Sequence, residues 1–212
     1  MVIKTIILDF DGVIVESNGI KAWAFQEIFK GYPNRLTEIM AYHNAQQATI
    51  RFEQFRYVTE DILEEEYTPG REQELSTRFS NLVLKRVIDC SFVPGALDFL
   101  EYFYPRVPLY MASINPSGDL ERILQARQLK KYFKKVYAHP WKKKDAIAEI
   151  LKSEGLNKNE AVFIGDITAD AFAAQEAGIE FIGRRADDNF ANMKIAVYND
   201  LKEIKDVLQK RI

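Results

Sequence analysis

Four aspartates in this sequence occur at spacings that suit phosphoryl-transfer chemistry. Asp9 and Asp11 are two residues apart, and Asp166 and Asp170 are four residues apart. On an extended strand, side chains two residues apart share a face, so both members of the first pair can point into one cleft. One carboxylate can attack phosphorus to form an aspartyl-phosphate. The other can protonate the leaving oxygen and later deprotonate a water molecule.

The same carboxylates predict a bound cation if the fold brings them together. Like charges at close range repel strongly unless a cation neutralises them. Mg²⁺, a hard dication that prefers oxygen ligands, suits a set made of Asp9, Asp11, Asp166 and Asp170. The sequence contains one cysteine, Cys90, and two histidines, so no cluster of these residues indicates zinc.

Groups that bind phosphate oxygens follow two further apolar runs. Ser113 follows one run, and three adjacent lysines, Lys142, Lys143 and Lys144, follow another. A hydroxyl and an ammonium are suitable partners for phosphate oxygens. Together with a cation they can stabilise a phosphoryl group in transfer. Spacing alone does not choose among the three lysines.

The elements that must position these residues are short apolar strands alternating with amphipathic helices. The predicted strands are residues 3–10, 107–112, 136–138, 161–164, 180–182 and 195–197. The predicted helices of this part are residues 96–104, 119–129, 145–154, 169–177 and 201–210. This alternation predicts an α/β fold with a doubly wound parallel sheet. Ligands bind such sheets beyond the carboxyl ends of the strands, where the polar residues lie.

A helical segment separates the first strand from this alternation. Residues 17–88 carry apolar side chains at helical spacing, and Pro33 and Pro69 punctuate the helices. We therefore expect two domains. Residues 1–15 and 89–212 would form the α/β core, and residues 16–88 would form an inserted helical domain.

Four segments resemble the motifs of the haloacid dehalogenase-like (HAD) hydrolase superfamily. Asp9-Phe10-Asp11-Gly12-Val13 resembles the first motif, Asp-x-Asp-Gly-[Val/Thr], Ser113 the second, Lys143 the third, and the segment from Gly165-Asp166 to Asp170 the fourth, Gly-Asp-x-x-x-Asp. The motifs occur in the expected order and span nearly the whole chain. The resemblance implies a Rossmann-like core with a helical cap similar to that of the phosphoglycolate phosphatase and β-phosphoglucomutase branch. Such caps close over the site and select the substrate.

The resemblance also implies a role for each carboxylate. Asp9 would be the nucleophile and a metal ligand. Asp11 would be the general acid and base, with its main-chain carbonyl on the metal. Asp166 would be a metal ligand, and Asp170 would assist the metal site or orient its waters and the lysine.

Phosphate binding would fall to a second group of residues. The resemblance implies that Ser113 binds the phosphate together with the amide of Ile114 or Asn115. The third-motif lysine, Lys143 or Lys144, would add its positive charge.

Structural roles compete with these assignments. Asp9 or Asp11 could be a turn or helix-cap aspartate. Ser113 could cap the helix after Pro116, and Asp170 could merely begin its helix. The occurrence of all four motifs, each after a predicted strand, favours the catalytic interpretation.

The helical domain contains three candidate substrate contacts. His43, Asn44 and Arg51 could touch the leaving group. The segment 51–57 looks like a cap segment of some sugar- or nucleotide-sugar-associated members of the superfamily, although Gln54 occupies the place of a lysine. The alternative is that His43 and Arg51 are solvated or structural.

The leading functional prediction is a Mg²⁺-dependent phosphatase that acts on a small phosphorylated metabolite, with sugar phosphates among the candidates. A phosphosugar mutase would use the same core but must keep water from the aspartyl-phosphate. A dehalogenase needs neither an acid and base at Asp11 nor a metal at Asp166, so both residues argue against it. Intact motifs argue against a non-catalytic binding protein.

Composition limits the partners and the location. The net charge of −2 indicates neither a nucleic acid nor an anionic membrane surface as a partner. No apolar stretch approaches the ~18 residues of a membrane span. A single cysteine allows no intrachain disulfide, which fits a reducing compartment. We therefore expect a cytoplasmic protein, as a monomer or weak dimer.

Overall fold

The computed structural model describes residues 2–46, 48–186, 190–191 and 193–212. The chain divides into two compact units. Unit 1 consists of Met1–Glu16 and Cys90–Ile212, and unit 2 consists of Ser17–Asp89. Unit 1 contains all the motif residues, and unit 2 contains the three candidate substrate contacts.

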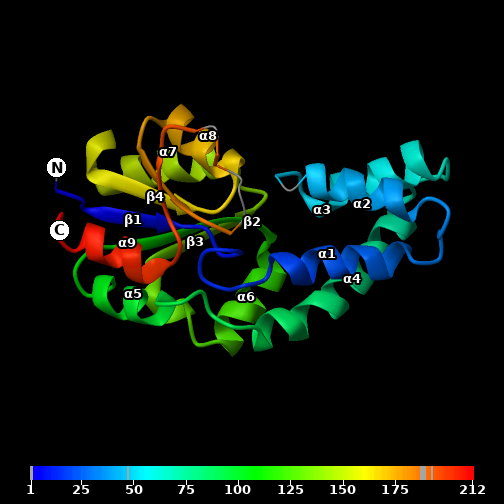
Figure 1. Cartoon of the computed structure of the whole chain (residues 1–212), viewed down its shortest axis with the longest axis horizontal. Helices are drawn as coiled ribbons and strands as arrows, with labels where there is room; N and C mark the ends of the chain where they lie inside the picture. The colour runs from blue at the N-terminus through cyan, green and yellow to red at the C-terminus, as the bar shows by residue number, and fades with distance from the viewer. Residues whose placement is uncertain (1, 47, 187–189, 192) are drawn as a thin grey trace. The chain divides into compact units, whose positions relative to one another are not determined.

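Within the described part of unit 1, six parallel strands form one sheet (Figure 1). They are β1 (Thr5–Leu8), β2 (Leu109–Pro116), β3 (Lys135–His139), β4 (Ala161–Gly165), β5 (Glu180–Arg184) and β6 (Ala196–Tyr198). Their order is β3-β2-β1-β4-β5-β6, and each neighbouring pair is parallel. The predicted doubly wound sheet is therefore confirmed. The strand expected at residues 107–112 begins later and continues to Pro116, with a shift of register against β3 between Ala112 and Pro116.

Helices cover both faces of this sheet. They are α5 (Ala96–Phe103), α6 (Ser117–Ala126), α7 (Lys143–Glu154), α8 (Thr168–Ala177) and α9 (Leu201–Leu208), with short 3-10 turns at Lys130–Tyr132 and Lys158–Glu160. In Figure 1, α7 and α8 lie together on one face, and α5 and α9 lie together on the other. Every residue of β1 and β4 is buried as a result. This explains why these strands are continuous apolar runs rather than alternating ones.

The strand order reverses between β1 and β4. Leu8, the last residue of β1, pairs with Met111 of β2 on one side and with Ile164 of β4 on the other. Ligands of doubly wound sheets bind beyond the carboxyl ends of such strands. Gly12 has φ 66°, a left-handed conformation that glycine adopts without steric cost, and it turns the chain soon after β1.

The described part of unit 2 is helical. It contains α1 (Asn18–Phe29), α2 (Leu36–Ala45), α3 (Arg51–Tyr57), the π-helical turn η1 (Val58–Ile62) and α4 (Pro69–Asp89). Its core is an aromatic cluster in which Phe25 lies 5.1 Å from Phe29 and 5.7 Å from Phe55, between ring centroids. Phe79 of α4 packs edge-on against Phe55 at 5.8 Å. These contacts join three helices through one buried cluster.

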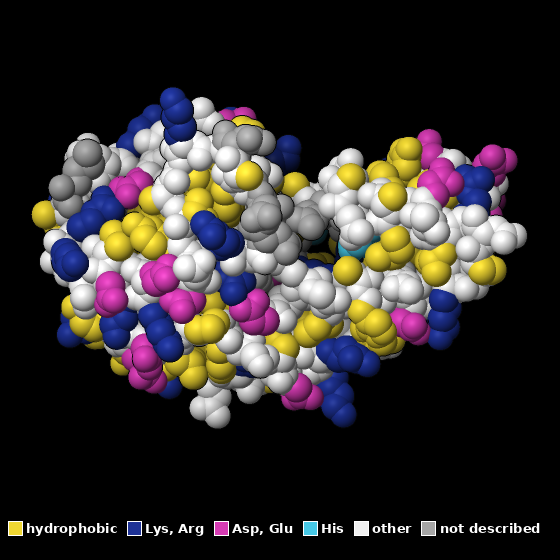
Figure 2. All heavy atoms as spheres, viewed as in Figure 1, with side chains coloured by type: hydrophobic (Ala, Val, Ile, Leu, Met, Phe, Trp, Pro, Cys, Tyr) yellow, Lys and Arg dark blue, Asp and Glu magenta, His cyan; other side chains and the backbone are white. Residues whose placement is uncertain are grey.

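Charged side chains of both signs are interspersed on the face of the molecule seen in Figure 2. Salt bridges such as Lys30–Glu27 and Arg71–Glu74 show the same mixture within unit 2. No helix in the described ranges is long and apolar enough to span a bilayer.

Candidate active site

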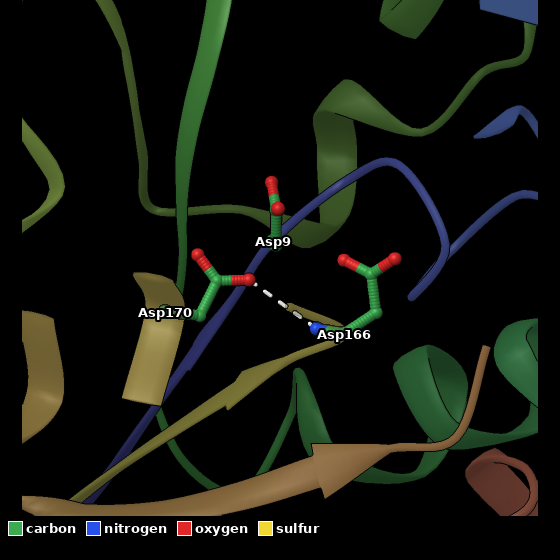
Figure 3. A group of neighbouring side chains, drawn as sticks. All are labelled: Asp9, Asp166 and Asp170. Carbon is green, nitrogen blue, oxygen red and sulfur yellow. Dashed lines mark hydrogen bonds between the residues drawn. The ribbon is translucent and has the colours of Figure 1, made fainter. Parts of the chain in front are cut away.

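Three aspartate side chains meet beyond the carboxyl ends of β1 and β4. Asp9 follows β1, Asp166 follows β4, and Asp170 lies in the first turn of α8 (Figure 3). Each offers a carboxylate oxygen, and these oxygens lie within 4.8 Å of one another. The main-chain amide of Asp9 donates to the carbonyl of Ile164 at 2.9 Å. This bond ties the loop after β1 to the end of β4.

Lys143, the first residue of α7, lies between two of these carboxylates. Its Nζ is 2.6 Å from Oδ2 of Asp9 and 2.5 Å from Oδ1 of Asp170. Burial alone lowers the pKa of this ammonium, but the negative charges of Asp170 and Asp9 outweigh burial and raise the pKa above its usual value. Lys143 therefore stays positively charged at the site.

The carboxylate of Asp9 is held at both oxygens. Oδ1 accepts a hydrogen bond from the amide of Phe10 at 2.6 Å, and Oδ2 accepts from Lys143. Burial raises the pKa of Asp9 to about 6, against the opposing effect of the Lys143 charge. The carboxyl group is thus mostly ionised at neutral pH, as a nucleophile must be.

The carboxylate of Asp170 binds both the main chain at the start of α8 and the side chain of Lys143. Its Oδ2 accepts from the amides of Asp166 at 3.2 Å and Ile167 at 3.5 Å, which holds the start of α8. Its Oδ1 faces Lys143. Gly165 permits this approach, because a Cβ added there would lie 2.5 Å from the Cβ of Asp170. The helix-start interpretation of Asp170 therefore accounts for only one of its oxygens.

Asp11 contacts the segment that ends β2. Nδ2 of Asn115 donates to Oδ2 of Asp11 at 2.7 Å, and the Asn115 amide donates to Oγ of Ser113 at 3.2 Å. Ser113 is buried within β2. Helix α6 follows Pro116 without a side-chain cap, so Ser113 does not have the capping role considered above. The structure thus brings residues 113–115 to Asp11, with Ile114 half-buried between them.

The geometry distinguishes the three adjacent lysines. Lys143 faces the carboxylates, whereas Nζ of Lys144 lies 3.2 Å from Oε2 of Glu176. The side chain of Lys144 is 55% exposed, against 9% for Lys143. Lys142 precedes the helix and is exposed.

The donor set of this cluster suits a hard dication. The carboxylates of Asp9, Asp166 and Asp170 supply oxygen ligands, which Mg²⁺ prefers. Three carboxylates face one ammonium, so a dication would balance the remaining negative charge. The side chain of Asp11 is outside this group of three, and its expected contribution is its main-chain carbonyl.

In unit 2, His43 is fixed by Gln54. The amide nitrogen of Gln54 donates to the carbonyls of Gln46 at 3.0 Å and Thr49 at 2.7 Å. Its oxygen must therefore accept from Nδ1 of His43, which lies 2.7 Å away. This assigns the proton of the neutral imidazole to Nδ1 and leaves Nε2 as an acceptor. The ring also stacks on Phe25 at 4.1 Å.

The other two candidates of unit 2 have different surroundings. The guanidinium of Arg51 lies 5.3 Å from the ring centroid of Phe52 and 5.4 Å from that of Phe79. Asn44 is exposed near the end of α2. His43 and Arg51 therefore both pack on the aromatic cluster of unit 2, and substrate contact by any of the three stays a prediction.

Stability should fall at acidic pH through His43. Burial lowers the pKa of His43 from its ordinary 6.5. As pH falls below about 6.5, the unfolded chain protonates this ring more readily than the folded chain does, so the His43 contribution to the free energy of unfolding decreases. The raised pKa of Asp9 acts in the opposite direction, so the His43 contribution must be isolated by mutation. Urea denaturation at pH 7 and pH 5 measures this loss. Relative to its value at pH 7, the free energy of unfolding at pH 5 should be higher in His43→Gln than in the wild type, whereas His139→Gln, a change of the other histidine, should not raise it. The same relative value in His43→Gln as in the wild type would contradict the assignment.

Comparisons with known proteins identify the family and the fold. The family model described as haloacid dehalogenase-like hydrolase matches residues 6–184, and the chain belongs to this family. A curated phosphoglycolate phosphatase from Pseudomonas fluorescens is 27% identical over 96 residues. That match covers 42% of this chain and only 35% of the relative.

Solved structures share the fold over nearly the whole chain. YfnB from Bacillus subtilis, bound to magnesium, has a TM-score of 0.75 at 17% identity and covers 99% of this chain and 100% of its own. A predicted phosphoglycolate phosphatase from Haemophilus somnus has a TM-score of 0.78 at 17% identity and 97% coverage of each chain. CbbY from Rhodobacter sphaeroides, in complex with xylulose 1,5-bisphosphate, has a TM-score of 0.74 at 15% identity and 96% coverage of each.

Three contacts, two in unit 1 and one in unit 2, were missed from the sequence. The side chain of Asn115, rather than only its amide, contacts Asp11. Gln54 fixes His43, and Arg184 binds Glu16. No short-range pattern marks these pairs, although a buried arginine at a strand end is the kind of residue that needs a partner.

Proposed function

We propose that this chain is a Mg²⁺-dependent phosphatase that hydrolyses a small phosphorylated metabolite through an aspartyl-phosphate on Asp9. The observation that carries the proposal is the position of Lys143, whose ammonium contacts both Asp9 and Asp170. An ammonium thereby contacts the carboxylate that we propose as the nucleophile, beside further carboxylates that could hold a metal ion. Membership of the hydrolase family and the partial match to a phosphoglycolate phosphatase support it.

In the first step, a carboxylate oxygen of Asp9 attacks phosphorus while the bond from phosphorus to the ester oxygen breaks. Asp11 gives its proton to the departing alcohol, so the leaving group is neutral. The Asn115 side chain orients the Asp11 carboxyl group by donating to its Oδ2. The product is a mixed anhydride of Asp9 and phosphate.

In the second step, a water molecule attacks the same phosphorus atom. Asp11, now ionised, takes a proton from this water. The bond between phosphorus and the Asp9 oxygen breaks, inorganic phosphate leaves, and the carboxylate of Asp9 is restored. Lys143 offsets negative charge on the phosphoryl oxygens in both steps.

Magnesium would be held by Asp9, Asp166, the main-chain carbonyl of Asp11 and, directly or through water, Asp170. When bound, it supplies positive charge that neutralises the phosphoryl oxygens. Ser113 with the amide of Ile114 or Asn115 would bind the same oxygens. Unit 2 would act as the substrate-selecting cap, and a cytoplasmic location stays a prediction.

Phosphate release from a panel of phosphorylated metabolites tests the proposal. We expect one class of small phosphate esters to release inorganic phosphate in the presence of Mg²⁺. Removal of the metal by a chelator should abolish release, and added Mg²⁺ should restore it. Turnover that survives the chelator would overturn the metal assignment. Interconversion of sugar phosphates without phosphate release would favour the mutase alternative.

Lys143 should matter far more than its neighbour. Lys143→Met removes a preorganised cation, and we expect kcat to fall by about 10²–10³-fold. Lys144→Met removes an exposed partner of Glu176, so it should leave kcat within about twofold. Steady-state kinetics of the two variants measure the contrast. Equal effects would show that Lys143 is not the lysine of the site.

A further inference from the structure

Arg184 is a buried cation that the mechanism above does not use. It is the last residue of β5, and its side chain is only 8% exposed. The other buried polar residues of the described ranges are aspartates and neutral side chains. A buried guanidinium is costly unless it is paired and hydrogen-bonded. The hydrogen-bond partners of Arg184 therefore indicate the role of this charge.

The guanidinium of Arg184 holds the loop that follows β1. Nη1 donates to the carbonyl of Gly12 at 3.1 Å and to Oε2 of Glu16 at 3.1 Å. Nη2 donates to the other carboxylate oxygen of Glu16. Nε donates to the carbonyl of Asn199, just beyond β6, at 3.3 Å. One side chain thus joins the ends of β5 and β6 to two points of the loop.

These two points flank the part of the loop that leads away from Asp11. Gly12 is the next residue after Asp11, and Glu16 is the last residue of unit 1 before the chain enters unit 2. Between them, main-chain bonds connect Gly12 to Val15 and Glu16 to Ser91. The carbonyl that Arg184 binds belongs to the peptide between Gly12 and Val13, one residue beyond Asp11. Fixing this peptide limits movement of the chain that continues from Asp11, and a rigid loop is needed to hold Asp11 in place.

We propose that Arg184 is a positioning residue that fixes the loop of residues 9–16. By binding Gly12 and Glu16 together, it keeps Asp11 aligned with Asp9 and prevents movement of the linker at Glu16 from reaching the catalytic aspartates. This inference rests on the proposed function for its catalytic consequence. The effect on the loop itself does not depend on turnover.

The same strand provides a matched control. Glu180, at the opposite end of β5, forms a bidentate pair with Arg211 at 2.8 Å and 2.5 Å. Arg184→Met and Arg211→Met each remove one arginine–glutamate pair from β5. Only the first of these pairs contacts the loop after β1.

Hydrogen exchange and kinetics on the full-length variants test the proposal. In Arg184→Met, exchange should increase in peptides covering residues 10–16, and kcat should fall by about 10–100-fold with KM within about threefold. Arg211→Met should change neither. Glu16→Gln should lower kcat less, and Arg184→Met combined with Glu16→Gln should resemble Arg184→Met alone, because the two side chains act as a pair.

Unchanged exchange in residues 10–16 of folded Arg184→Met would overturn the proposal. So would a fall in kcat that Arg211→Met shares, since this would indicate a general loss of stability. If the wild-type protein releases no phosphate from any ester, the proposed function fails, and the exchange comparison still decides whether Arg184 fixes the loop.

Discussion

Asp9→Asn should lower kcat by at least about 10⁴-fold, because an amide oxygen cannot replace the attacking carboxylate. The substitution preserves the size of the side chain. Its oxygen can still accept from the Phe10 amide or from Lys143, so the loop should stay folded. Burial raises the pKa of Asp9 to about 6, so the folded protein disfavours the ionised form of this carboxyl group. The variant removes that negative charge. Stability should therefore change little while turnover is lost.

The control for this variant removes an exposed carboxylate outside the cluster. Asp145 lies in the first turn of α7, close in sequence to Lys143, and is exposed. Asp145→Asn should leave kcat within about twofold, as expected for a surface substitution. Phosphate release by Asp9→Asn at the wild-type rate would exclude Asp9 as the nucleophile.

Asp11→Asn should have the second largest effect, a fall in kcat of about 10²–10⁴-fold, because it removes the general acid and base. An asparagine oxygen can still accept the hydrogen bond from Asn115, so the side chain should keep its place. The loss should depend on the leaving group. An aryl phosphate releases a phenolate that needs no proton, so its first step should survive better than that of an alkyl ester.

This dependence predicts a burst. With an aryl phosphate, Asp11→Asn should release phenol rapidly in an amount equal to the enzyme and then release phosphate slowly, because the second step still needs a base. Stopped-flow absorbance of the phenolate measures it. A loss of the same size for aryl and alkyl esters, without a burst, would contradict the role of Asp11 as acid and base.

The α/β core could be predicted because each of its strands and helices has its own local pattern of apolar residues. Strands buried on both faces are almost entirely apolar, and β4 and, apart from Thr5, β1 are such runs. Asp9 and Asp166 come directly after β1 and β4 in the sequence. Their positions alone therefore predicted that they lie together at the carboxyl ends of these strands.

Spacing could not choose the lysine of the site, because Lys142, Lys143 and Lys144 are chemically equal and adjacent, and only the resemblance to the family pointed to Lys143. The choice depends on the direction in which α7 begins relative to the sheet. Only the fold determines that Lys143 faces Asp9 while Lys144 reaches Glu176.

Long-range partners were also beyond prediction. Arg184 binds Gly12 and Glu16 across more than 160 positions of sequence, and no periodic pattern connects them. The extension of β2 to Pro116 was missed for a related reason, since the apolar run that predicted the strand ends at Ala112. Pairing with β3 determines the observed end.

The central claim is that Asp9 carries the phosphoryl group during turnover. Asp11→Asn mixed with an aryl phosphate and Mg²⁺, quenched in acid during the burst and digested, should yield a phosphorylated peptide. Mass spectrometry should locate the phosphoryl group on Asp9, and hydroxylamine should remove it, as expected for an acyl phosphate. A phosphoryl group on another residue, or an unmodified Asp9 peptide after a full burst of phenol, would contradict the account.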